Sequence, residues 1–210
     1  KPLAEACREK GLDPEAILTE IENLPAGKDQ VQTELLKMTL TELANHIEQT
    51  HHVYLYRELP ELISLAGRVT ATHAARDTRL HQVLQGVTLL QSELMNHLAK
   101  EEQILFPMIR ELEASNSLPS FHCGSVGNPI RQMLTEHDDA SELLQKLRRL
   151  TDGYQSPEWA CRSMQTLFTQ LQNLEHDLHR HIHKENTILF PAAIALEEQK
   201  RTGKTCATNC

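Results

Sequence analysis

One eleven-residue pattern occurs twice in the chain and carries residue types that bind metals. The copies cover residues 97–107 and 181–191, and both read H-x-x-K-E-x-x-I-L-F-P. On a helix, residues four apart lie on one face, so each copy presents an imidazole and a carboxylate in the same direction. A single pair of this kind is common on a solvated helix face, but its repetition indicates one site built from two similar halves. The pairs are His97 with Glu101 and His181 with Glu185.

Two further histidines extend the repeat to the preceding helices. His52 lies 45 residues before His97, and His137 lies 44 residues before His181. In an up-down-up-down bundle that rises about 1.5 Å per residue, all four histidines fall roughly 13–16 Å from the same end. The sequence therefore predicts one layer of six metal-binding side chains: His52, His97, Glu101, His137, His181 and Glu185.

The donor set of this layer, four imidazoles and two carboxylates, restricts the metal. It is too large for one tetrahedral zinc and too rich in nitrogen for calcium or magnesium. If both carboxylates bridge two metals and each metal takes two histidines, every metal has four protein ligands. A bridging oxide or hydroxide would add a fifth and leave the sixth octahedral position open for a small ligand. We expect two iron ions, with manganese as the alternative.

Four long helices are expected to hold this layer. The first begins at a capping box, Thr39–Glu42, and runs to about Gly67, with Pro60 kinking it or interrupting its hydrogen bonds. The others are expected at residues 77–106, 129–150 and 157–190, with extensions toward 112 and 198. No segment alternates with a period of two over the length of a strand. The predicted fold class is all-α, an up-down-up-down four-helix bundle.

A small helical unit is expected before the bundle, because Asp13–Pro14 has the form of a helix start. The chain then divides into a partial N-terminal helical unit with its linker at residues 1–28, the bundle at 33–198 and a polar tail at 199–210.

The composition excludes several classes of partner. Of 210 residues, 21 are basic and 29 acidic, a net charge of −8 that argues against nucleic acid or an anionic membrane. No apolar run approaches the roughly 18–20 residues that span a bilayer, and residues 1–10 show no signal-peptide pattern. The five cysteines are odd in number and lack a C-x-x-C spacing, which is typical of a reducing compartment. We expect a cytoplasmic protein.

The two patterns, each with a histidine on the helix before it, resemble a hemerythrin-like domain. The segments at residues 57–62 (RELPEL), 100–108 (KEEQILFPM) and 135–138 (TEHD) resemble more closely the repair-of-iron-centres (RIC) subgroup. Residues 6–14 are similar to the small domain that precedes the bundle in that subgroup, although the cysteine pair usual upstream is absent. The resemblance covers residues 1 to about 197.

The resemblance implies a bacterial di-iron protein, induced by nitrosative or oxidative stress, that restores damaged iron–sulfur clusters. It also implies terminal ligation by the four histidines and bridging by Glu101 and Glu185. Hemerythrin proper has a fifth histidine at one iron; no equally placed residue is evident here, which disfavours an oxygen carrier.

Three functions stay open at the level of sequence. The leading hypothesis is iron donation to damaged or apo iron–sulfur proteins. The rivals are a nitric oxide reductase that produces nitrous oxide and a scavenger or sensor that binds nitric oxide or oxygen without turnover. The assembly that we consider is a homodimer.

Other polar residues are weaker candidates. Glu93, one turn before His97, and Glu136, next to His137, could relay protons or iron, and His73 could lie at the mouth of the bundle. Glu102 is expected to be a surface charge. The remaining histidines are expected to have no role in the site: His46, His51, His81, His122, His176, His179 and His183. Cys206 and Cys210 are expected to be free thiols in the tail.

Overall fold

The computed structural model describes residue 7, residues 13–15 and residues 34–203. The chain divides into two compact units, Lys1–Met38 and Thr39–Cys210. Most of the expected N-terminal unit lies outside the described residues, as do Cys206 and Cys210. At the expected helix start, Pro14 and Glu15 are helical, and the Glu15 backbone N–H donates to Asp13 Oδ1 at 3.0 Å.

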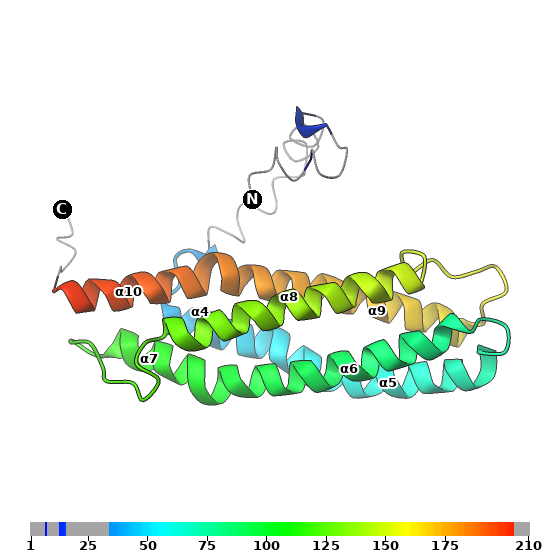
Figure 1. The fold of residues 1–210 in the computed structure, drawn as a ribbon, viewed down its shortest axis with the longest axis horizontal. Coiled ribbons are helices and arrows are strands. Elements are labelled where there is room, and N and C mark those ends of the chain that lie inside the picture. Colours follow the sequence, from blue (N-terminus) through cyan, green and yellow to red (C-terminus); the bar gives the residue numbers. More distant parts are fainter. Residues whose placement is uncertain (1–6, 8–12, 16–33, 204–210) are drawn as a thin grey trace. The chain divides into compact units, whose positions relative to one another are not determined.

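Four helical rods, antiparallel in sequence order, form the second unit (Figure 1). The first rod consists of α4 (Leu40–Ile47), η1 (Glu48–His52) and α5 (Val53–His73). The second consists of α6 (Arg79–Lys100), η2 (Glu101–Leu105) and α7 (Phe106–Ala114). The third is α8 (Gly127–Leu150), and the fourth consists of α9 (Arg162–Lys184), η3 (Glu185–Leu189) and α10 (Phe190–Thr202). No strand occurs in the part of the chain that the structure describes, which confirms the all-α bundle.

Leucine-rich faces hold the rods together. Helix α5 packs against α6 and α9, and α6 also packs against α8. Leu55, Leu59 and Leu62 follow one another at helical spacing on α5 and are at most 2% exposed. Each such side chain contributes about 1.5–3 kcal/mol when it leaves water. This apolar core extends from the predicted metal layer toward the α5–α6 turn and fixes the rods on which the layer depends.

The first rod begins where the capping box predicts. Thr39 Oγ1 accepts the Glu42 backbone N–H at 3.1 Å, and Glu42 Oε2 accepts the Thr39 N–H at 2.8 Å. The rod continues to His73, beyond the predicted end at Gly67. Burial of Val69 and Thr70 against the bundle extends the helix past the glycine.

Two predicted starts are displaced. Helix α8 begins at Gly127, two residues before the predicted start at residue 129, and the Asn128 amide donates to the Cys123 carbonyl at 2.6 Å. Helix α9 begins at Arg162, because Pro157 opens a turn in which its carbonyl accepts the Ala160 N–H at 2.8 Å.

Three of the rods change from α-helix to a wider π-helical turn, and each change falls at a predicted ligand. Turn η1 ends with His52, η2 begins with Glu101, and η3 begins with Glu185. The N–H groups that close the turns reach back five residues, from Val53 to Glu48, Phe106 to Glu101 and Phe190 to Glu185. After η2 and η3, though not after η1, the phenylalanine is followed by a proline, which has no N–H to donate and needs space for its ring. The wider turn fits both requirements, and the helix continues beyond it.

The rods are not membrane spans: no helix among the described residues is long and apolar enough to cross a bilayer.

Candidate metal centre

The structure brings the six predicted side chains into one buried layer between the four rods. They come from η1, α6, η2, α8, α9 and η3, and none is more than 4% exposed. The members are His52, His97, Glu101, His137, His181 and Glu185.

The two carboxylates divide their oxygen atoms between different histidines. Glu101 Oε2 lies 3.4 Å from His52 Nε2, and Glu101 Oε1 lies 3.4 Å from His97 Nε2. Glu185 Oε1 lies 3.1 Å from His181 Nε2, and its Oε2 lies 3.2 Å from His137 Nε2. Each carboxylate therefore faces two separate pairs of imidazoles.

These contacts define two overlapping groups, in each of which all four ligand atoms lie within 4.8 Å of one another. One group contains His52 and His181, the other contains His97 and His137, and both contain Glu101 and Glu185. Two cations about one carboxylate length apart would fit this arrangement.

The hydrogen-bonding state of the layer also fits bound cations. Within the described chain, His52 Nε2, both carboxylate oxygens of Glu101 and Glu185 Oε2 are buried without a hydrogen-bond partner. Buried polar groups left unpaired cost about 1–3 kcal/mol each. Cations between the groups would satisfy all of them.

The outer nitrogens of three histidines are held by the neighbouring rod. His52 Nδ1 lies 2.8 Å from Glu102 Oε1, and His97 Nδ1 lies 2.9 Å from Glu136 Oε2. Such contacts fix the tautomer, so that the inner Nε2 atom carries a lone pair, and they raise the basicity of a ligating imidazole. Glu102 was expected to be a surface charge; it is partly exposed, but its carboxylate also lies against the first rod and contacts His52.

The third contact was not anticipated from the sequence. His137 Nδ1 lies 2.9 Å from Asn186 Oδ1, which can only accept. His97 Nε2 and His137 Nε2 then both carry a lone pair and no proton, and they lie 3.2 Å apart. A cation between them would remove the repulsion of the two lone pairs. Asn186 follows Glu185 as Glu102 follows Glu101, so the repeat itself contained the signal.

Aromatic rings pack against two of the histidines. Phe106 stacks on His52 with ring centroids 5.7 Å apart, and Phe190 stacks on His137 at 6.0 Å. The phenylalanine in each repeated pattern therefore supports the histidine of the preceding rod.

Burial sets the protonation of the layer. It is the main cause that lowers the pKa of His52 to about 3 and that of His97 to about 4, so both imidazoles are neutral at neutral pH and able to bind metal. Burial and the nearby Glu185 raise the pKa of Glu101 well above its usual value. Burial opposes ionisation of Glu185 as well, but the adjoining His181 lowers its pKa well below the usual range. Burial thus favours the neutral forms of His52 and His97 and, without a cation, resists a second negative charge in the layer.

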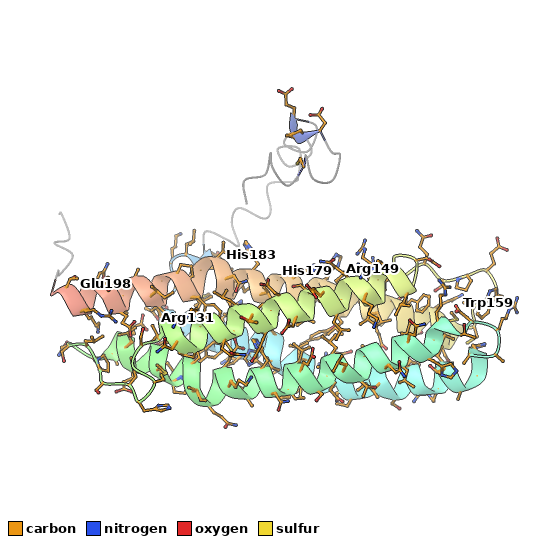
Figure 2. The ribbon with its side chains drawn as sticks, viewed as in Figure 1. Arg131, Arg149, Trp159, His179, His183 and Glu198 are labelled. Carbon is orange, nitrogen blue, oxygen red and sulfur yellow. The ribbon has the colours of Figure 1, made fainter. Side chains whose placement is uncertain are left out.

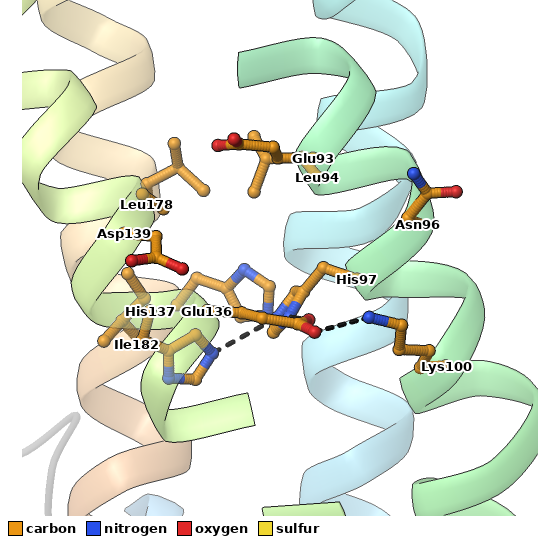
Figure 3. Close-up of a pocket in the computed structure, with 12 residues that line it drawn as sticks. Glu93, Leu94, Asn96, His97, Lys100, Glu136, His137, Asp139, Leu178 and Ile182 are labelled. Atoms are coloured by element: carbon orange, nitrogen blue, oxygen red, sulfur yellow. Dashed lines mark hydrogen bonds and ion pairs between the residues drawn. The ribbon is translucent and has the colours of Figure 1, made fainter. Parts of the chain in front are cut away.

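A cavity of about 190 Å³ leads to this layer between α6, α8 and α9 (Figure 3). His97, His137 and His181 line its inner end. Glu136 lies at its side, in contact with Lys100, and the exposed Glu93 also lines it. Glu93 lines the cavity but is exposed, so the structure places it on the access route rather than within the buried layer.

His73 is the candidate that the fold places elsewhere. It ends α5, 21 residues after His52, which corresponds to about 31 Å along a helix. Its Nε2 lies 3.0 Å from Cys161 Sγ, and its ring lies 5.9 Å from that of Trp159. It is therefore far from the mouth of the layer.

The histidines expected on the surface of α9 are exposed: His176, His179 and His183. Figure 2 shows His179 and His183 on the outside of that helix. His51 differs from the expectation of no role, because it is buried and stacks on His181.

The model of the hemerythrin HHE cation binding domain matches residues 43–193, a region that contains the whole layer. The chain belongs to the hemerythrin family.

Relatives define the group within that family. The chain is 35% identical over 195 residues to proteins named iron-sulfur cluster repair protein YtfE from Citrobacter koseri and from Enterobacter sp. strain 638. It is 34% identical to the protein of that name from Escherichia coli O17:K52:H18. Each match covers 93% of this chain and 84% of the relative. The resemblance to the repair-of-iron-centres group is confirmed.

Proposed function

We propose that this chain is a non-haem di-iron protein that repairs iron–sulfur clusters damaged by nitrosative or oxidative stress. The names of its relatives support repair as the function. The geometry of the layer supports two metal ions in place of one. Its expected partners are damaged or apo iron–sulfur proteins, and its expected location is the cytoplasm.

The division of the carboxylate oxygens is the observation that carries the proposal. In the proposed site, His52 and His181 would hold one iron and His97 and His137 the other, and the two glutamates would serve both. The two groups share both carboxylates, so a change in either glutamate alters both groups. A single zinc or calcium would leave two of the imidazoles unused.

Two ferrous ions in this layer would supply iron for transfer and an open position for a small ligand such as nitric oxide or oxygen. The chain's own residues perform the remaining tasks. His52 and His97 are buried and neutral at neutral pH, so the metal does not have to displace protons from them. Glu136 and Glu93 line the cavity and offer carboxylates to a cation that leaves by this route.

Metal analysis of the purified full chain tests the site. We expect about two irons per chain; one zinc per chain, or no metal after growth with iron, would contradict the proposal. Manganese is distinguished in the same measurement.

Iron transfer tests the function. The ferrous protein is incubated with an apo [2Fe–2S] ferredoxin and sulfide, and cluster absorbance and iron in both proteins are followed. Repair by donation predicts that the site empties as the cluster forms. Nitrous oxide in the headspace after addition of nitric oxide, without loss of iron, would instead indicate a reductase. Reversible binding with neither product nor loss would indicate a scavenger or sensor.

A further inference from the structure

His181 differs from the other three histidines of the layer in its outer nitrogen. His52, His97 and His137 each have a hydrogen-bond partner at Nδ1. Among the residues that the structure describes, none pairs with His181 Nδ1, although the side chain is only 1% exposed. The orientation of this imidazole must therefore depend on another contact.

That contact is the ring of His51. The two ring centroids lie 5.1 Å apart and the ring planes differ by 7°, a parallel stack. His51 is itself 1% exposed, so the stack is enclosed by protein. A stack of this kind limits rotation of the His181 ring, and aromatic pairs contribute beyond their buried area.

His51 is held by side chains from the helix that carries His181. Its Nδ1 lies 2.9 Å from Asp177 Oδ1, and its Nε2 lies 2.8 Å from Lys184 Nζ. The lysine amine donates to Nε2, so the His51 proton is on Nδ1 and is donated to Asp177. Asp177 and Lys184 lie one turn before and one turn after His181, and together they fix the His51 ring flat against it.

The repeat shows that this arrangement replaces a hydrogen bond. His51 precedes His52 as Glu136 precedes His137. In the second half of the chain, Glu136 accepts a hydrogen bond from His97 Nδ1. At the equivalent position of the first half, a stacked ring takes the place of the carboxylate. The two halves of the layer are therefore supported by different interactions.

We propose that His51 is a positioning residue for His181, which it orients by stacking in place of a hydrogen bond at Nδ1. The inference rests on the proposed di-iron site and assigns this support to only one of the two metal positions, that of His52 and His181. Loss of the His51 ring should loosen that iron and leave the iron of His97 and His137 in place.

The experiment compares the full-length wild type with His51→Leu and His51→Phe after loading with ⁵⁷Fe. Removal of iron by a ferrous chelator and the Mössbauer spectrum are measured. We expect His51→Leu to release one of the two irons about 10-fold faster, at the low end of the roughly 10- to 100-fold effect of contacts behind metal ligands, and to change the spectrum of that iron alone. His51→Phe keeps a flat ring and should restore most of the retention.

His81→Ala is the matched control, since His81 is exposed on α6 and outside the layer. Equal release of both irons in His51→Leu and wild type would overturn the inference, as would a Phe variant no better than the Leu variant. If the Leu variant does not fold, Lys184→Met tests the inference in its place, because it removes one contact that holds His51. This variant should release the same iron about twofold faster or more. Release at the wild-type rate would overturn the inference. A wild type without two irons would instead contradict the proposed function.

Discussion

At the scale of single residues, Glu101 and Glu185 determine whether the layer acts as one site or two. Both are 0% exposed, and both lie within reach of both histidine pairs. A carboxylate that served one metal would turn both oxygens toward it or leave one bonded to protein. The oxygens of each glutamate instead face different imidazoles, so the two metal positions should depend on each other.

Substitution of either glutamate tests this dependence. We expect Glu101→Ala or Glu185→Ala to lower the affinity for both irons, because each removes a ligand from both positions. Iron per chain is measured after dialysis against graded chelator. Glu111→Ala removes an exposed carboxylate outside the layer and the cavity and should retain two irons. Loss of one iron with normal occupancy of the other would contradict bridging.

The carboxylate behind His52 offers a second test at this scale. Glu102→Ala removes the acceptor of the His52 Nδ1 proton, and we expect iron affinity to fall about 10- to 100-fold. Glu111→Ala, an exposed position on the same rod, should have no effect. Competition with a chelator of known affinity measures both. If the two variants bind iron equally, the contact does not support the ligand.

At the scale of helices, two of the π-helical turns begin at the carboxylates of the layer and shift the register of the helix that follows. The i, i+4 spacing predicts that His97 and Glu101 share a face, and this holds because α6 is regular up to Lys100. The turn that follows at Glu101 shifts the register of α7 relative to α6. Helix α7 therefore turns a different set of side chains toward the bundle than it would if the helix continued without the turn.

Deletion of one residue from such a turn tests its role. Removal of the exposed Gln103 should restore α-helical register and rotate His97 and Glu101 by about 100° relative to α7. We expect helical circular dichroism close to that of the wild type but fewer than one iron per chain. Gln103→Ala, which keeps the length of the turn, should bind two irons. Normal iron content in the deletion variant would show that the turn is dispensable.

These turns also mark the limit of what the sequence could predict. Leucines at helical spacing, the capping box at Thr39 and the repeated pattern predicted the four rods and the six side chains that the fold brings together. Periodicity assumes a regular helix, so it could not reveal a π-helical turn. It also follows one helix at a time, so the contacts of Glu102 and His51 with neighbouring rods could not be derived from it, although the repeat does relate Asn186 to Glu102.

At the scale of the whole molecule, the buried layer couples folding to protons and to metal. In the metal-free bundle, several buried nitrogen and oxygen atoms of the layer have no hydrogen-bond partner. Metal bound to the folded chain but not to the unfolded chain adds stability in proportion to its affinity. The same groups make the metal-free bundle sensitive to acid.

The sign of this sensitivity follows from the shifted pKa values. His52 and His97 have folded pKa values of about 3 and 4 against 6.5 unfolded, so the unfolded chain binds more protons below pH 6.5 and stability falls as pH falls. Each histidine costs about 1.4 kcal/mol per pH unit in this window. The raised pKa of Glu101 acts in the opposite direction above pH 4.5 and offsets part of this loss of stability. Below pH 4.5, the lowered pKa of Glu185 adds to the loss.

We therefore expect the free energy of unfolding of the metal-free protein to fall between pH 6.5 and 4.5 by less than the roughly 2.8 kcal/mol per unit of two histidines, and to fall further below pH 4.5. Urea unfolding followed by circular dichroism at a series of pH values measures it. Iron-loaded protein should be more stable at every pH in this range and should lose iron as stability falls, because protons and metal compete for the same imidazoles. The double variant His52→Gln with His97→Gln removes both titrating rings and should show a flatter profile than the metal-free wild type. An unchanged slope in that variant would assign the acid sensitivity to groups outside the layer.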